Sequence, residues 1–156
     1  MKVYLVRHGE AASSETNPER SLTHTGRENT QRIANFIGRP CLKVKAIEHS
    51  GKLRAQETAD ILGASVESEE GVAKADGLAP NDDVEPWVGQ LTRAEGDLML
   101  VGHLPFMGRL ASALLTGSND PVFVDFKPSS ILCLERTNEG TWYISWLISP
   151  ELVPST

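Results

Sequence analysis

Cysteine is scarce in this chain. Cys41 and Cys133 are the only two among its 156 residues, and they form neither a CxxC pair nor a zinc-binding pattern. The scarcity excludes a disulfide-rich scaffold, and the spacing excludes a structural zinc site built on cysteine. The sequence instead predicts two free thiols, each buried or half-buried.

Long apolar runs are absent too. No stretch approaches the roughly 20 apolar residues that a membrane-spanning helix needs, and a composition of 40% hydrophobic and 23% charged residues is typical of a globular protein. The chain passes directly into a strand-like segment at Val3, which leaves no room for a leader peptide, so we expect a cytoplasmic protein. Its length predicts one domain that spans 1–156.

Positive charge is in short supply. The chain has 15 lysines and arginines against 21 aspartates and glutamates, a formal net charge of −6. This balance argues against broad binding to nucleic acid or to an anionic membrane, because both are negatively charged. We therefore expect no nucleic-acid partner and no membrane partner, although a small basic site for a phosphate remains compatible with the composition.

The first motif follows an apolar segment, Val3–Val6, which predicts a short buried strand. The strand runs into Arg7, His8 and Gly9. Ligands bind at the carboxyl ends of parallel strands, so this position makes Arg7 and His8 candidate site residues. Gly9 allows a sharp turn and a close approach of the backbone to a ligand. In the polar loop that follows, Ser13 is placed to touch an anion, and a plain solvated loop is the alternative.

Two helices and a second strand are expected before the middle of the chain. Thr25 and Glu28 predict a capping box at the start of the first helix. Residues 42–47 predict a strand, and Ser50 is then a plausible N-cap for the second helix. Arg54 falls in the first turn of that helix, and side chains there lean back toward the N-terminus. We therefore expect Arg54 to project over the same crevice as the first motif.

The opening arrangement is repeated later in the chain. Residues 97–101 predict another apolar strand, and this strand also ends in a glycine and a histidine, Gly102 and His103. Pro105 is suited to the first turn of a following helix, and Gly117 is suited to its end. A third carboxyl end thus carries a polar group toward the crevice.

The remaining segments complete an alternating pattern. We expect one short strand at 64–66, a helix capped within 81–83, and strands at 122–126, 131–135 and 142–148. In the last strand, Trp142, Ile144, Trp146 and Ile148 alternate and predict a single apolar face. Strands that alternate with helices and then end in a hairpin indicate an α/β sandwich with a mostly parallel sheet and an antiparallel edge.

Two arginines and two histidines, namely Arg7, His8, Arg54 and His103, are therefore expected around one crevice. They make a poor metal site, because arginine cannot ligate a cation and repels it. They make a good phosphoryl site, because guanidinium groups match phosphate oxygens in geometry and charge. A neutral imidazole can also attack phosphorus and form a covalent intermediate. We expect no metal and no cofactor.

In this order and spacing, the motifs resemble those of the histidine phosphatase superfamily, whose fold is also called phosphoglycerate mutase-like. The segments that carry the resemblance are Arg7-His8-Gly9, Leu22-Thr23 with Gly26, Ser50 with Leu53-Arg54-Ala55 and Thr58-Ala59, and Gly102-His103. The short length and the run His103-Leu104-Pro105 most resemble the small members that act on phosphohistidine. The resemblance implies a three-layer α/β/α sandwich in which His8 is the phosphorylated nucleophile. It also implies that Arg7, Arg54 and His103 bind the phosphoryl group.

No residue stands out as a general acid. Acid phosphatases of this superfamily have an aspartate directly after the second histidine, and this chain has Leu104 there. The candidates elsewhere are Asp76, Asp82, Asp83 and Glu85. A phosphohistidine substrate needs less help from an acid, because imidazole, with a reference pKa of roughly 6.5, leaves more readily than an alkoxide.

The expected function is therefore a metal-independent phosphatase that acts on protein phosphohistidine. Short connections favour this substrate, because the roughly thirty residues between the second helix and the 97–101 strand cannot build a large lid, and an open site admits a protein. A small-molecule phosphatase or mutase of the same superfamily is the first alternative. A module that recognises phosphate without turnover is the second.

Overall fold

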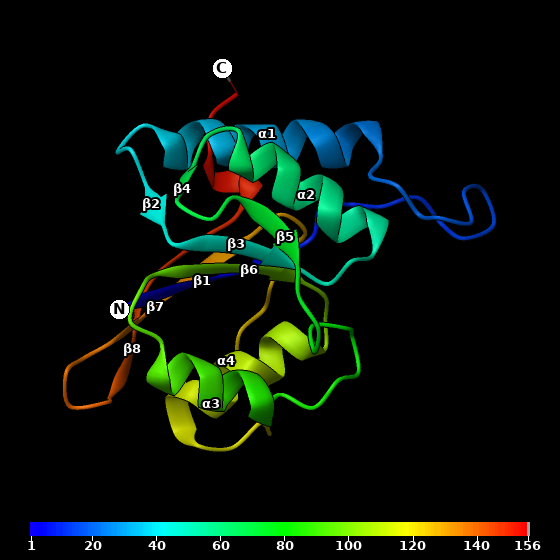
Figure 1. Cartoon of the computed structure of the whole chain (residues 1–156). Helices are drawn as coiled ribbons and strands as arrows, with labels where there is room; N and C mark the ends of the chain where they lie inside the picture. Colours follow the sequence, from blue (N-terminus) through cyan, green and yellow to red (C-terminus); the bar gives the residue numbers. More distant parts are fainter. Residues whose placement is uncertain (156) are drawn as a thin grey trace.

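The computed structural model describes residues 1–155, and a six-stranded sheet lies at its centre (Figure 1). The strand order is β5-β3-β6-β1-β7-β8. The strands are β1 (Lys2–Arg7), β3 (Ala46–His49), β5 (Val72–Lys74), β6 (Leu98–Gly102), β7 (Ile131–Arg136) and β8 (Trp142–Ile148). The first four in chain order pair in parallel, whereas β7 pairs antiparallel with β1 and with β8. A separate pair consists of β2 (Lys43–Val44) and β4 (Glu67–Ser68).

Helices cover both faces of this sheet. They are α1 (His24–Gly38), α2 (Leu53–Gly63), α3 (Glu85–Arg93) and α4 (Phe106–Thr116), and a short 3-10 helix, η1 (Pro150–Leu152), follows β8. The first two helices lie on one face and the next two on the other, as Figure 1 shows. The expected α/β/α sandwich with a mostly parallel sheet and an antiparallel edge is confirmed. Within residues 1–155, no helix combines the length and apolarity needed to cross a membrane.

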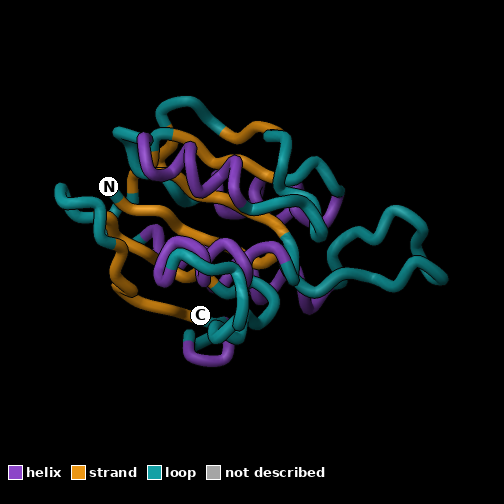
Figure 2. The backbone as a smooth tube through the Cα atoms, turned by 90° about the horizontal axis from the view of Figure 1, so that it is seen from below, coloured by secondary structure: helices purple, strands orange, loops and turns teal. Residues whose placement is uncertain are grey.

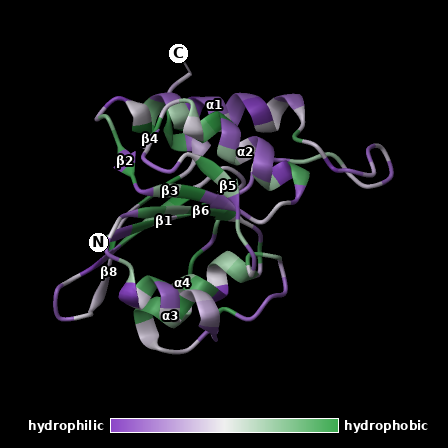
Figure 3. Ribbon diagram, viewed as in Figure 1, coloured by the Kyte–Doolittle hydropathy of each residue, from purple (hydrophilic) through white to green (hydrophobic). Residues whose placement is uncertain are grey.

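The central strands are buried on both faces, which explains why their sequences read as continuous apolar runs. In β1, Val3 and Leu5 pack toward α3 and α4, whereas Tyr4 and Val6 pack toward α1 and α2. Figure 3 shows the hydrophobic colouring concentrated on the central strands and on the helix faces turned toward them. Each fully buried aliphatic side chain of this kind stabilises the fold by about 1.5–3 kcal/mol. The strand ends that carry polar residues are therefore held by a rigid core.

The N-terminus of α1 differs from the expected capping box. Thr23, not Thr25, is the N-cap, and its hydroxyl accepts a hydrogen bond from the Gly26 amide at 2.9 Å. Glu28 does not reach back to the cap. Its Oε1 atom lies 3.1 Å from the Nε2 atom of His24 on the exposed side of the helix. A threonine two positions earlier meets the same chemical requirement, so the pattern alone could not distinguish the two caps.

Three predicted strands are wrong in their extent or existence. Residues 42–47 form two short strands, β2 and β3, rather than one. Residues 64–66 lie in the turn after α2, and the strands of this region come later as β4 and β5. Residues 122–126 form no strand, and the six strands of the main sheet do not include them. An apolar pattern predicts extended backbone, but it does not identify a pairing partner.

The predicted single apolar face of β8 is also wrong. The pairing with β7 shifts at Ser145, which is left unpaired as a bulge. Because an extra residue reverses the side-chain alternation, Trp142 packs toward α3 and α4, while Trp146 and Ile148 pack toward α1 and α2. Ile144 lies beside the bulge and is 53% exposed.

The two cysteines are unpaired, as expected from their spacing. Cys133 is buried in β7, but Cys41 is exposed, so the expectation of a buried or half-buried thiol is wrong at Cys41. Cys41 lies in the turn after α1, and its φ of 57° is that of a turn residue at the surface.

Candidate active site

The candidate site lies where β1 and β6 end side by side. Their parallel register pairs Arg7 with Gly102, so the next residue of each strand, His8 or His103, enters the same space. The His8 amide donates to the Gly102 carbonyl at 2.9 Å, and the two imidazole centroids are 4.9 Å apart. The sheet therefore brings together two histidines that are far apart in the sequence, and we call them the histidine pair.

The His8 ring is held by its own turn. Its Nδ1 lies 2.7 Å from the Gly9 carbonyl, which fixes Nδ1 as the donor and leaves Nε2 with its lone pair. The Gly9 amide donates to the Thr58 hydroxyl at 3.0 Å, and that hydroxyl donates to the Arg54 carbonyl at 2.7 Å. This chain of hydrogen bonds connects the β1 turn to the first turns of α2, which carry Arg54.

Close packing around Gly9 leaves no room for a side chain. A Cβ at this position would lie 2.7 Å from the Thr30 hydroxyl and 3.0 Å from that of Ser129, and these two hydroxyls hydrogen-bond to each other at 2.8 Å. We expect Gly9→Ala to lower the free energy of unfolding by about 1–3 kcal/mol, because buried neighbours would have to move. Urea titration measures this change.

Gly89→Ala is the matched control for that prediction. Gly89 lies in α3, and the nearest atoms to an added Cβ belong to the Arg93 side chain at 3.5 Å, which is ordinary contact. Alanine in a helix should raise the free energy of unfolding by up to about 1 kcal/mol. Equal stabilities for Gly9→Ala and the wild type would contradict the packing described here.

His103 is 1% exposed and is held by Ser50. The Ser50 hydroxyl lies 2.6 Å from the Nε2 atom of His103. The sequence predicted Ser50 as the N-cap of α2, and this is wrong, because Lys52 takes that position without a side-chain hydrogen bond. Ser50 instead follows the carboxyl end of β3, next to β6. The rule that selected His8 and His103, a polar residue just beyond a strand, would also have selected Ser50.

The two expected arginines come from different elements. Arg7 ends β1, and its Nη1 donates to the Phe126 carbonyl at 2.7 Å, while Arg54 is the second residue of α2. The Nε atoms of both are buried and have no hydrogen-bond partner among residues 1–155. Buried guanidinium donors of this kind are suited to an oxyanion, which would supply the missing acceptors.

A third arginine was not expected. The loop after β1 projects away from the body of the molecule (Figures 1 and 2). On the returning side of this loop, Arg20 donates from Nε to the Ala12 carbonyl at 3.0 Å. The charge of Arg20 contributes to lowering the pKa of His8. A periodic sequence pattern does not identify a loop residue such as Arg20, because only the return of the loop brings its charge near His8. Ser13 is exposed and bonds to Thr16 in its own loop, so its contact with an anion stays a prediction.

Burial and positive charge favour neutral imidazoles in the histidine pair. Burial is the largest cause that lowers the pKa of His8 to about 4, followed by the charges of Arg54 and Arg7. Burial likewise lowers the pKa of His103 to about 3, with further contributions from His8 and Arg54. Desolvation therefore outweighs the arginine charges at His8. Near pH 7, His8 is therefore unprotonated and nucleophilic.

A titration should reveal this shift. An ordinary imidazole gains its proton as the pH falls through about 6.5, whereas we expect His8 to stay neutral until the pH falls to about 4. NMR of histidine-labelled protein, with His8→Ala to assign the resonance, measures the midpoint. A His8 midpoint near 6.5 would contradict the desolvated environment described here.

The carboxylates of two candidate general acids, Asp82 and Asp83, have other partners. Asp82 accepts from the Ala79 amide at 2.9 Å, and Asp83 accepts from the Glu85 amide at 3.0 Å at the start of α3. The backbone carbonyl of Asp76 accepts from the Trp87 indole of α3 at 3.1 Å. None of these hydrogen bonds reaches the histidine pair. The choice among the four carboxylates therefore stays open.

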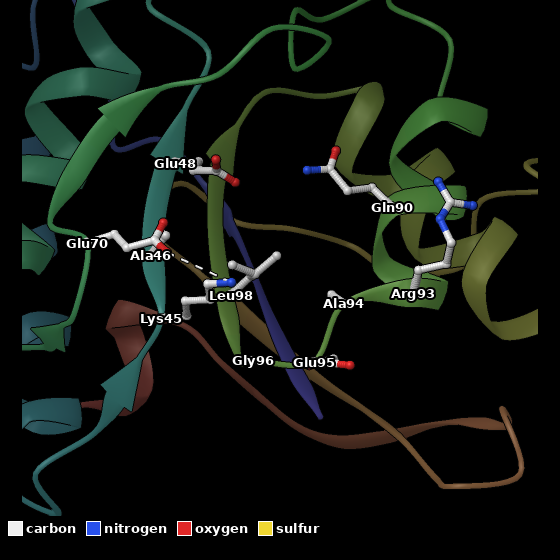
Figure 4. Close-up of a pocket in the computed structure, with 10 residues that line it drawn as sticks. All are labelled: Lys45, Ala46, Glu48, Glu70, Gln90, Arg93, Ala94, Glu95, Gly96 and Leu98. Carbon is white, nitrogen blue, oxygen red and sulfur yellow. Dashed lines mark ion pairs between the residues drawn. The ribbon is translucent and has the colours of Figure 1, made fainter.

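The rest of the described structure offers a second polar pocket but no metal-binding cluster. Across residues 1–155, no three His, Cys, Asp or Glu side chains are grouped so that they could hold a metal ion. A polar pocket of about 290 Å³ is lined by Lys45, Glu48, Glu70, Gln90 and Arg93 among others (Figure 4). Figure 4 shows its Glu48 and Arg93 side chains, and no histidine lines it. It is separate from the histidine pair.

Comparisons with known proteins identify a family and several relatives. The family described as the histidine phosphatase superfamily (branch 1) matches residues 3–79. The phosphohistidine phosphatase SixA of Escherichia coli is 28% identical over 156 residues, covering 96% of this chain and 94% of that protein. An uncharacterized protein of Picosynechococcus is 35% identical over 124 residues, covering 75% of this chain and 74% of its own.

Two histidines and one arginine at the strand ends of an α/β/α sandwich, with a second arginine in the first turn of a helix, are typical of a class of phosphoryl-transferring enzymes. The chain belongs to the histidine phosphatase superfamily, and it is an enzyme. Among solved structures, that of the protein histidine phosphatase SixA complexed with tungstate matches with a TM-score of 0.83 and 25% identity, covering 96% of this chain and 97% of that one.

Proposed function

We propose that this phosphatase is metal-independent and removes phosphate from protein phosphohistidine through a phosphorylated His8. The observation that carries the proposal is the state of His8. Its Nδ1 is held by the Gly9 carbonyl, its pKa is lowered to about 4, and its ring faces His103 at 4.9 Å. A neutral, oriented imidazole beside guanidinium groups whose Nε atoms are buried is suited to attack on phosphorus.

The first step transfers the phosphoryl group to the enzyme. The Nε2 lone pair of His8 attacks phosphorus, and the P–N bond to the substrate imidazole breaks with its electrons staying on the departing ring. The substrate ring, protonated on its other nitrogen, leaves as neutral imidazole, and phosphorylated His8, which keeps its Nδ1 proton on the Gly9 carbonyl, takes over the positive charge. Arg7 and Arg54 neutralise the equatorial oxygens, whose charge is spread in the transition state. His103, oriented by Ser50, supplies a further polar contact to these oxygens.

The second step is hydrolysis of the phosphorylated enzyme. A water oxygen attacks phosphorus, and the bond to His8 Nε2 breaks with its electrons returning to the ring. Both protons of the water stay on the phosphate that forms, and His8 returns to its neutral form with the proton on Nδ1. The leaving group is again an imidazole, so neither step requires a strong general acid. This matches a chain with Leu104 in place of the acid-phosphatase aspartate, in which the Asp82 and Asp83 carboxylates bind backbone amides.

The relatives support the same substrate. SixA of Escherichia coli is named a phosphohistidine phosphatase, and the solved SixA holds tungstate, a tetrahedral oxyanion that resembles phosphate. We carry this substrate over to the present chain because the match spans nearly its whole length. The partner is thus a phosphorylated protein, and a cytoplasmic location is consistent with it.

Substrate comparison tests the proposal. We expect kcat/KM for free phosphohistidine and for a histidine-phosphorylated protein to exceed that for phosphoserine, sugar phosphates and phosphoglycerate. A preference for any of these alcohol esters would instead favour a small-molecule phosphatase or mutase. Tight binding of phosphate without any turnover would favour a recognition module.

A further inference from the structure

Three exposed apolar side chains lie beside the candidate active site. Leu104 directly follows His103 and is 36% exposed, and Val122 and Phe123 are 45% and 52% exposed. Val122 and Phe123 belong to a segment that continues to Phe126. The Phe126 carbonyl accepts a hydrogen bond from Arg7 of the site. We call Leu104, Val122 and Phe123 the rim patch.

Packing holds the rim patch against the start of α4. A Cβ added to Gly108 would lie 2.7 Å from Val122, so this valine sits directly on the first turn of the helix. Val122 and Pro105 also line the same pocket of about 540 Å³. The patch is therefore a fixed part of the surface that continues from His103, and it is not a loose loop tip.

Negative charge surrounds the same pocket. Asp82, Asp83 and Asp120 line it together with a single cation, Arg109. The site itself has the opposite sign, since its arginines lower the pKa of the histidine pair. A small phosphorylated anion gains nothing from this acidic pocket. A protein with lysine or arginine near its phosphohistidine is attracted by the acidic pocket through its cations and by the site through its phosphoryl group.

We propose that the rim patch and the acidic pocket dock the phosphorylated protein, which presents an apolar surface flanked by basic residues next to its phosphohistidine. This inference rests on the proposed function and adds the chemistry of the partner. Aromatic side chains typically contribute most to the binding energy of such contacts, so Phe123, the aromatic member of the rim patch, is the expected anchor. Asp120 contributes through charge.

Two substrates separate docking from chemistry. One is free phosphohistidine, which fits the site but cannot reach the rim patch, and the other is a core histone phosphorylated on histidine with phosphoramidate, which is basic. We expect Phe123→Asp to lower kcat/KM for the histone by about tenfold or more, with no change for free phosphohistidine. Asp120→Lys should act in the same direction on the histone alone, and added salt should reduce its effect.

Tyr143→Asp is the matched control, because Tyr143 is an aromatic residue of β8 with a similar exposure of 58%. It should leave both rates unchanged. Equal histone rates for Phe123→Asp and the wild type would overturn the docking surface alone, as would equal losses on both substrates. A wild-type enzyme that hydrolyses neither substrate would overturn the proposed function, and the docking surface with it.

Discussion

Replacing His8 with alanine should lower kcat by about four to six orders of magnitude, the scale of loss when a covalent nucleophile is removed. Alanine leaves no nitrogen to attack phosphorus, while Arg7 and Arg54 would still bind the phosphoryl group. We therefore expect KM to change far less than kcat. Steady-state hydrolysis of free phosphohistidine measures both constants.

His24 provides the control for this experiment. It is an exposed histidine at the start of α1 and interacts with Glu28 rather than with the site. His24→Ala should retain nearly full activity. If His8→Ala retained activity comparable to that of His24→Ala, the chemistry could not pass through His8, and only a role in binding would remain.

Arg54 is expected to show the second largest effect. Arg54→Ala should lower kcat by about 100- to 1000-fold, the usual cost of removing one preorganised donor from a transition state. Arg54→Lys should recover little of this loss, because an ammonium group keeps the charge but lacks the two-pronged geometry that matches phosphate oxygens. The difference in kcat between the two variants separates the contribution of the guanidinium geometry from that of its charge.

Arg93 is a suitable reference for the arginine variants. It lies in the last turn of α3 and lines the separate polar pocket. Arg93→Ala should change kcat by no more than about twofold, as is usual for a surface substitution. Full recovery of kcat in Arg54→Lys would show that charge alone is needed and would contradict a bidentate role.

Much of the arrangement could be predicted because it depends on strand order and strand ends. The apolar runs before Arg7 and Gly102 are unmistakable, and parallel pairing of two such strands necessarily puts His8 beside His103. The helical pattern around Ala55 and Thr58 likewise predicted the first-turn position of Arg54. These features follow from local sequence and a general rule of α/β topology.

Features that depend on tertiary packing could not be predicted in this way. The bulge at Ser145 arises from the pairing of β8 with β7, and no residue type in the strand announces it. The contact between Ser50 and His103 depends on how β3 and β6 are aligned. The charge of Arg20 comes close to His8 only because its loop folds back. Each of these depends on the distance between segments rather than on a periodic pattern.

The most direct test of the account is to locate the transferred phosphate. The enzyme would be mixed with phosphohistidine, quenched within milliseconds in base, digested, and analysed by mass spectrometry. The account predicts one acid-labile phosphoryl group on the peptide that contains His8, and none in His8→Ala. Phosphate found on His103 instead, or full turnover with no phosphorylated peptide at any quench time, would contradict it.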